Sequence, residues 1–207
     1  MSYRDFSLSD VVTKFSLVTR EDGSFFSDRP TVQPSPLLVE TLRANVPIAV
    51  AISNEKVRSE LVVAPVLMEL KRLHPTAIGF FSGVDLTADP DAGLTGTCDF
   101  LLSLTSEQAY VKAPIVTLVE AKRDDLASGV GQCVAEMIGA RIFNERAGNA
   151  IETVYGAVTT GTTWRFMSLS GSILTLDFNE YSINDLGKIL GILVSMIAPP
   201  ARAPRAA

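Results

Sequence analysis

The spacing of apolar residues along the chain changes between a helical and a strand-like period. From Ser53 to about Leu73 they recur at three- and four-residue intervals, which predicts a helix. Either Ser53 or Asn54 can cap its first turn, where Glu55 also interacts favourably with the helix dipole. Pro65 lies in the interior of this segment, so we expect the helix to kink or divide there.

Three strand-like apolar runs follow this helix, separated by turn-length gaps. They cover residues 78–84, 98–104 and 114–121. Consecutive strands with short connections favour an antiparallel meander. The third run is almost wholly apolar, which indicates that both faces of the sheet are covered.

A second long helix, predicted over residues 127–144, separates this meander from three further strand-like runs. Those runs cover residues 153–159, 164–169 and 173–178. A meander followed by a crossover helix and another strand implies a mixed sheet flanked by helices. We therefore predict an α/β fold of the α+β type, with the element order αβββαβ over residues 53–160.

The remaining segments are shorter or less regular. We expect helices over residues 7–18, 35–44 and 183–197. Residues 19–36 are predicted to form a loop, because they contain one Gly and three Pro residues. The length favours a single domain over residues 1–198, and the segment 199–207, rich in Pro and Ala, is expected to be disordered.

Charge and hydropathy narrow the possible functions and locations. The net charge of −5 argues against a freely acting, non-specific nuclease, because attraction to phosphate needs a basic surface. The apolar segment 186–198 is interrupted by Lys188 and is shorter than the roughly 20 residues that span a bilayer, so we expect no membrane partner. The first ten residues lack the apolar core of a signal peptide, which leads us to expect a cytoplasmic protein.

Cysteine and histidine are too few for a zinc site. Cys98 and Cys133 lie in apolar segments, and we expect both to be buried free thiols. The single histidine, His74, is expected at a helix end, as a capping or surface residue. The aspartates between residues 85 and 91 lack the spacing and the terminal glutamate of a calcium-binding loop.

Three charged residues stand at strand ends of the predicted meander. Glu120 and Lys122 close an apolar strand and alternate onto one face, and Asp99 begins the preceding strand, opposite that end in a hairpin. Two carboxylates held close together repel each other unless a cation separates them. Carboxylate, carbonyl and water oxygens are the ligands that Mg²⁺ and Mn²⁺ prefer. The alternative is that the strand simply emerges into solvent, where Arg123 begins a charged run.

This pattern resembles the PD-(D/E)XK nuclease-like superfamily, the fold of many restriction enzymes and DNA-repair nucleases. Glu120, Ala121 and Lys122 match the second half of its motif, and Asp99 matches the first half, although Cys98 stands where the family usually has Pro. The resemblance implies a restriction endonuclease-like core. It also implies a Mg²⁺ or Mn²⁺ ion held by Asp99, Glu120 and the carbonyl of Ala121.

The same family often carries a glutamate on the helix before the meander and a glutamine on the helix after it. Glu60 matches the glutamate by position, with Glu55 and Glu69 as alternatives, and Gln132 matches the glutamine. Glu60 can instead be an ordinary exposed helix residue. Gln132 and Glu136, four residues apart, can instead form the solvated side of their helix.

The resemblance implies a divalent-metal-dependent nuclease. In that reading Lys122 positions the attacking water, Glu60 binds the metal directly or through water, and Gln132 orients the substrate. The alternative on the same fold is a non-catalytic nucleic-acid-binding or assembly subunit with a vestigial site. A third reading is an unrelated α+β domain in which Glu120 and Lys122 form a surface ion pair, worth about 0–1 kcal/mol.

The expected partner of the protein is nucleic acid, DNA rather than RNA. A homodimer is expected because cutting both strands of a duplex requires two sites, and a larger complex is the alternative.

Overall fold

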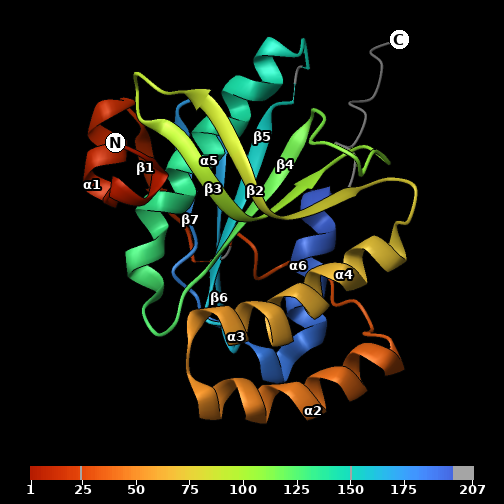
Figure 1. Ribbon diagram of the computed structural model, residues 1–207. Helices are drawn as coiled ribbons and strands as arrows, with labels where there is room; N and C mark the ends of the chain where they lie inside the picture. The colour runs from red at the N-terminus through yellow and green to blue at the C-terminus, as the bar shows by residue number, and fades with distance from the viewer. Residues whose placement is uncertain (24, 150, 198–207) are drawn as a thin grey trace.

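The computed structural model describes residues 1–23, 25–149 and 151–197 (Figure 1). Its centre is an eight-stranded mixed sheet in the order β1-β7-β6-β5-β4-β3-β2, with β8 paired to β6. The strands are β1 (Val18–Glu21), β2 (Gly79–Asp89), β3 (Leu94–Ser103), β4 (Ile115–Ala121), β5 (Thr153–Thr159), β6 (Thr163–Ser170), β7 (Ile173–Leu176) and β8 (Tyr181–Ser182). The mixed sheet confirms the predicted fold class.

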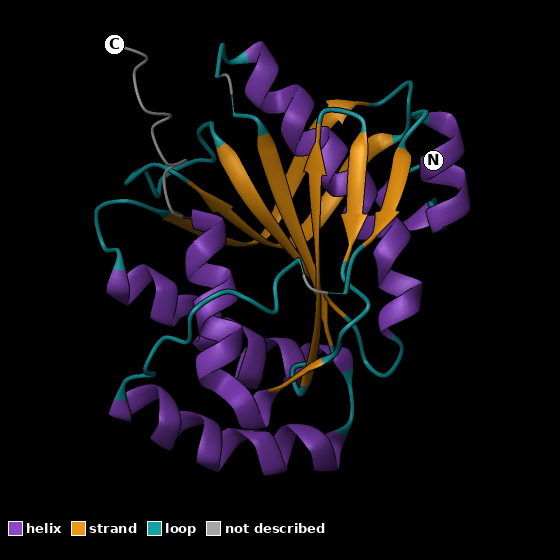
Figure 2. Cartoon of the chain, turned by 180° about the vertical axis from the view of Figure 1, so that it is seen from behind, coloured by secondary structure: helices purple, strands orange, loops and turns teal. Residues whose placement is uncertain are grey.

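Helices cover both faces of this sheet, and each layer has its own apolar core; Figure 2 shows the two layers from behind. One layer consists of η1 (Tyr3–Asp5), α1 (Leu8–Lys14) and α5 (Leu126–Arg146). The other consists of α2 (Pro36–Ile52), α3 (Glu55–Arg58), η2 (Ser59–Val63), α4 (Ala64–Leu73), η3 (Ile183–Asp185) and α6 (Leu186–Ile197).

The predicted meander is present, since β2, β3 and β4 pair antiparallel in sequence. The next strand, β5, lies parallel to β4, and α5 makes the crossover that a parallel pair requires. In the β3–β4 ladder Phe100 pairs with Val119. This register places the middle of β3, around Asp99, beside the end of β4, where Glu120 and Lys122 stand.

The crossover helix α5 is enclosed over much of its length. All of residues 129–140 are buried, between the sheet and the N-terminal segment. Glycines make this close approach possible, because a Cβ on Gly131 would lie 2.4 Å from the carbonyl oxygen of Phe6, and one on Gly139 would lie 2.2 Å from the hydroxyl of Tyr3. A helix buried all round has no polar face, so its sequence does not show which side faces the sheet.

The predicted helix before the meander divides near Pro65, as expected. Asn54 caps its start, with its side-chain oxygen accepting a hydrogen bond from the Val57 N–H at 2.8 Å. A π-helical turn, η2, then precedes α4. Proline cannot donate to the carbonyl four residues earlier, which is that of Leu61. That carbonyl instead accepts the side-chain amide of Asn45 at 2.8 Å, so helix α2 satisfies the group that the proline leaves free.

One predicted loop contains a strand. Residues 18–21 form β1, which pairs in parallel with β7 at the edge of the sheet. All four residues of β1 are exposed, so the strand lacks the alternation of buried and exposed positions that would reveal it in the sequence. The prediction of a loop over residues 19–36 was therefore wrong at its start.

Several element boundaries also differ from the predictions. The helix expected to end at residue 44 continues through Pro47 to Ile52, because Leu38, Leu42 and Ala49 keep one buried face along its length. Strand β3 begins at residue 94 rather than 98, β7 ends at residue 176 rather than 178, and β8 was missed. The segment expected to be disordered, 199–207, lies outside the described residues.

Two smaller predictions are confirmed. Cys98 and Cys133 are free and buried. His74 ends α4, where its N–H donates to the carbonyl oxygen of Leu70 at 2.9 Å. Within the described ranges of the chain, no helix is both long enough and apolar enough to cross a membrane.

Candidate functional site

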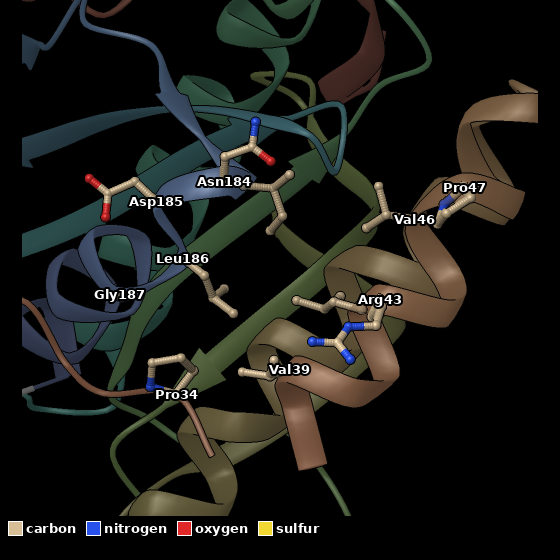
Figure 3. Close-up of a pocket in the computed structure, with 11 residues that line it drawn as sticks. Pro34, Val39, Arg43, Val46, Pro47, Asn184, Asp185, Leu186 and Gly187 are labelled. Atoms are coloured by element: carbon tan, nitrogen blue, oxygen red, sulfur yellow. The ribbon is translucent and has the colours of Figure 1, made fainter. Parts of the chain in front are cut away.

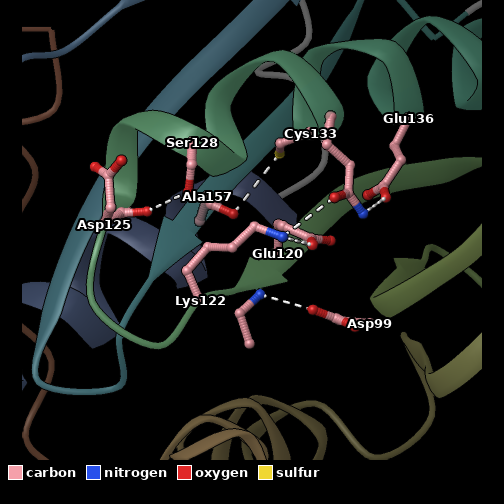
Figure 4. Close-up of polar contacts among 10 residues, drawn as sticks. Asp99, Glu120, Lys122, Asp125, Ser128, Cys133, Glu136 and Ala157 are labelled. Atoms are coloured by element: carbon pink, nitrogen blue, oxygen red, sulfur yellow. Dashed lines mark hydrogen bonds and ion pairs between the residues drawn. The ribbon is translucent and has the colours of Figure 1, made fainter. Parts of the chain in front are cut away.

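Asp99 lies beside the end of β4, as its predicted place in the hairpin required. Its Oδ2 atom accepts a hydrogen bond from the Ala121 N–H at 2.9 Å (Figure 4). The paired ladder between β3 and β4 ends at Phe100–Val119, and continuing this register brings Asp99 opposite Glu120. The carboxylate therefore takes the place of a backbone acceptor where the two strands stop pairing, which fixes its position against β4.

Glu120 and Lys122 form an ion pair at this strand end. The Lys122 Nζ atom lies 2.5 Å from Glu120 Oε1, and the two side chains are 17% and 2% exposed. One alternative from the sequence was that the strand emerges into solvent and that Glu120 and Lys122 form a surface ion pair. That alternative is wrong, because the pair is largely removed from water. Removing one partner of such a pair leaves the other charge buried and uncompensated.

Gln132 extends this pair toward the interior of α5. Its Oε1 atom accepts a hydrogen bond from Lys122 Nζ at 3.1 Å, and its Nε2 atom donates to Glu136 Oε1 at 3.0 Å. Gln132 and Glu136 are both buried, so the reading in which they form a solvated helix side is wrong. Figure 4 shows the side chains following one another from the end of β4 into α5. We call Asp99, Glu120, Lys122, Gln132 and Glu136 the strand-end cluster.

Glu136 was not among the predicted site residues. Its four-residue spacing from Gln132 was visible in the sequence, but this spacing fits a solvated helix face equally well. Only the burial of the whole helix shows that the pair points inward. The structure thus adds a second buried glutamate to the cluster.

The two buried glutamates are difficult to ionise together. Burial, and then the charge of Asp99, raise the pKa of Glu120 to about 7 against the opposing effect of Lys122. Burial, and then the charge of Glu120, raise the pKa of Glu136 well above its ordinary value. Burial by itself would lower the pKa of Lys122, but the Glu120 carboxylate outweighs this and the pKa is raised. Lys122 is therefore an ammonium ion at neutral pH.

The glutamates on the helical segment before the meander divide into three kinds. Glu60 is 62% exposed and pairs with Lys56 at 3.6 Å, and no described contact joins it to the strand-end cluster, so its role as a metal ligand stays a prediction. Glu69 is buried and accepts a hydrogen bond from the N–H of Ser35 at 2.9 Å, a structural role. Glu55 acts on the cluster through its charge, which raises the pKa of both Glu120 and Lys122.

A glycine makes room for the lysine. A Cβ added to Gly129, in the first turn of α5, would lie 3.0 Å from Lys122 Cε and 2.7 Å from Val158 Cγ1. The lysine stem therefore lies directly against the helix backbone on its way to Glu120 and Gln132. This contact could not be predicted from the sequence, because it depends on how α5 docks on β4 and β5.

A divalent ion of the Mg²⁺ type needs oxygen donors, and the carboxylates of the strand-end cluster are donors of this kind. Within residues 1–23, 25–149 and 151–197, no three His, Cys, Asp or Glu side chains are grouped so that they could hold a metal. Asp99 and Glu120 nevertheless offer two carboxylates from adjacent strands, and the buried Oε2 atom of Glu120 has no hydrogen-bond partner among the described residues. Mg²⁺ often takes only one or two protein carboxylates and keeps several waters. The residues therefore fit Mg²⁺ or Mn²⁺ in donor type and number.

A separate cavity of about 520 Å³ lies between α2 and the start of α6 (Figure 3). Its walls are mainly apolar, with Arg43 from α2 and Asp185 from η3 on opposite sides. Asp99, Glu120 and Lys122 do not line it. This cavity therefore contributes nothing to the chemistry of the strand-end cluster.

The sequence matches no protein-family model, and no curated protein is significantly similar to it.

Proposed function

We propose that this protein is a divalent-metal-dependent phosphodiesterase of the restriction endonuclease-like type, which cleaves nucleic acid and acts on DNA rather than RNA. The single observation that carries the proposal is the meeting of Asp99, Glu120 and Lys122 at one end of the β3–β4 hairpin. The element order around this hairpin supports it, because the meander is followed by a crossover helix that supplies Gln132 to the same place.

Four residues of the cluster have distinct roles in this proposal. Asp99 and Glu120 hold Mg²⁺ or Mn²⁺, with the carbonyl of Ala121 as a further ligand. When bound, such an ion lowers the pKa of a coordinated water and neutralises charge on the phosphate. Lys122 brings an ammonium to the same point, where it orients the attacking water or binds a phosphate oxygen. Gln132 holds that ammonium in place through its side-chain oxygen.

The experiment pairs calorimetric titration with Mn²⁺ and cleavage of supercoiled plasmid. The wild type is expected to bind Mn²⁺ and to convert the plasmid to nicked or linear DNA. In Asp99→Asn the amide oxygen can still accept from the Ala121 N–H, so this variant is expected to fold, to bind Mn²⁺ more weakly and to lose cleavage. Absent Mn²⁺ binding in the wild type, or equal binding in Asp99→Asn, contradicts the proposed metal site.

One observation favours the non-catalytic alternative on the same fold. The net charge of −5 opposes binding of a polyanion, which favours an assembly subunit over an enzyme that cleaves nucleic acid. A vestigial site predicts nucleic-acid binding or complex formation without Mn²⁺-dependent cleavage, so the same two measurements distinguish the alternatives. The homodimer also stays a prediction, and light scattering of the purified chain tests it.

A further inference from the structure

Glu136 occupies a position that packing alone does not explain. It lies on α5 with none of its surface exposed, among neighbours such as Cys133, Met137 and Ile138, which belong to the apolar core of this layer. A buried carboxyl group is costly unless it forms hydrogen bonds. Its one described hydrogen bond is the 3.0 Å contact in which Glu136 Oε1 accepts from Gln132 Nε2.

This hydrogen bond decides which end of the Gln132 amide faces Lys122. An amide carries a donor nitrogen and an acceptor oxygen at one end of the side chain. With the nitrogen directed at Glu136, the oxygen faces the Lys122 ammonium at 3.1 Å. The reversed amide would direct its NH₂ group at the Lys122 ammonium, an unfavourable contact between two donors, and would lose the hydrogen bond that Glu136 Oε1 accepts.

The surroundings keep this arrangement closed to solvent. Tyr3 packs across α5 at Gly139, and its hydroxyl and the Glu136 Oε2 atom are both buried without a hydrogen-bond partner in the described part of the chain. Glu136 is fully buried and Gln132 is 4% exposed, so their hydrogen bond is shielded from bulk solvent.

We propose that Glu136 is a positioning residue for Lys122, and that it acts by fixing the orientation of the Gln132 side-chain amide. This inference rests on the proposed function, because the proposed cleavage reaction is the reason why Lys122 must be held in place. Glu136 lies one helical turn beyond Gln132, and it is not part of the family motif. Glu136 touches neither the substrate nor the metal in this scheme.

The test compares Glu136→Gln with Glu136→Met. Glutamine keeps an oxygen that accepts from Gln132 Nε2, whereas methionine has similar length and no such acceptor. The first readout is NMR of the Lys122 ammonium, whose protons give a ¹⁵Nζ signal when hydrogen bonds slow their exchange, together with the side-chain amide signals of Gln132. The second readout is the single-turnover rate of plasmid cleavage with Mn²⁺.

Glu136→Gln is expected to keep the Lys122 signal and a cleavage rate near the wild-type rate. Glu136→Met is expected to lose the signal and to lower the rate roughly tenfold, as for a lost hydrogen bond that orients a reacting group. In a Gln132→Met background, the further change Glu136→Met is expected to alter neither readout, because the residue acts only through Gln132. Should Glu136→Met fail to fold, Glu136→Asp, which withdraws the acceptor by one methylene, takes its place.

An unchanged Lys122 signal in Glu136→Met overturns the proposal. Equal losses in Glu136→Gln and Glu136→Met also overturn it, since they would show that the charge or the packing of Glu136 matters rather than its acceptor. If the wild type cleaves nothing, the proposed function fails, and the NMR comparison still decides whether Glu136 positions Lys122.

Discussion

The helical segments on either side of the meander carry similar polar residues, but they differ in whether these residues are buried or exposed. In α5, residues 129–140 are all buried, and Gln132 and Glu136 point toward Lys122. In the segment before the meander, Glu60 is mostly exposed and pairs with Lys56. The docking of a helix on the sheet therefore decides which of its residues join the strand-end cluster. A carboxylate or amide at a suitable spacing is not sufficient.

The largest expected effect concerns Lys122, which is in contact with α5 through Gln132. Lys122→Met removes the ammonium but keeps an apolar stem, and we expect plasmid cleavage to fall by at least roughly a thousandfold, since charge stabilisation at the reacting phosphate is lost. Calorimetry is expected to show Mn²⁺ binding within a few-fold of wild type, because the carboxylates remain. Cleavage at the wild-type rate in this variant removes Lys122 from the mechanism.

The second effect concerns pH. The raised pKa of Glu120, about 7, means that the carboxyl group is increasingly protonated as the pH falls below 7, and a ligand must lose its proton to bind a metal. The Mn²⁺ affinity measured by calorimetry is therefore expected to fall about tenfold for each pH unit below 7. Glu60→Gln is the matched control and is expected to leave this dependence unchanged. A flat profile between pH 5.5 and 7.5 contradicts the role of Glu120.

A third prediction concerns the contact between α5 and the lysine. Gly129→Ala places a methyl group against Lys122 and Val158, and we expect it to lower the free energy of unfolding by about 1–3 kcal/mol. Plasmid cleavage is expected to fall several-fold as well, because the lysine stem is displaced. The neighbouring exposed residue provides the control: Ser128→Ala is expected to change stability by less than about 0.5 kcal/mol. Urea denaturation of both variants measures the difference.

The smallest expected effects lie on the segment before the meander. Glu60→Gln is expected to leave the cleavage rate within about twofold of wild type, since an exposed ion pair contributes little. Glu55→Gln removes a charge that acts on Glu120 and Lys122, so its effect is expected to be larger than that of Glu60→Gln. A Glu60 variant that loses Mn²⁺ binding reverses the comparison between the two helical segments and restores Glu60 as a ligand.

The hairpin at the centre of the site could be predicted from the sequence. Strand alternation places Glu120 and Lys122 on one face, and a hairpin brings the start of one strand to the end of the next, so the position of Asp99 followed. The edge strand β1 could not be predicted in this way, because all its residues are exposed and no alternation marks them.

The helix faces were harder to predict, for two physical reasons. Glu60 lies inside a π-helical turn, which inserts an additional residue and rotates the following side chains relative to an ordinary helix. The period of a regular helix therefore does not indicate the direction of the Glu60 side chain. In α5 the apolar residues surround the axis, so no period indicates that Gln132 and Glu136 point inward.

The hydrogen bond between Asp99 and the Ala121 N–H has a consequence for how such a protein changes over generations. Asparagine at this position would keep the acceptor that joins the two strands and lose the negative charge that a cation requires. Under the proposed function, one substitution at residue 99 would therefore separate catalysis from folding. A descendant with asparagine there would be a stable, inactive protein, free to be retained for binding alone.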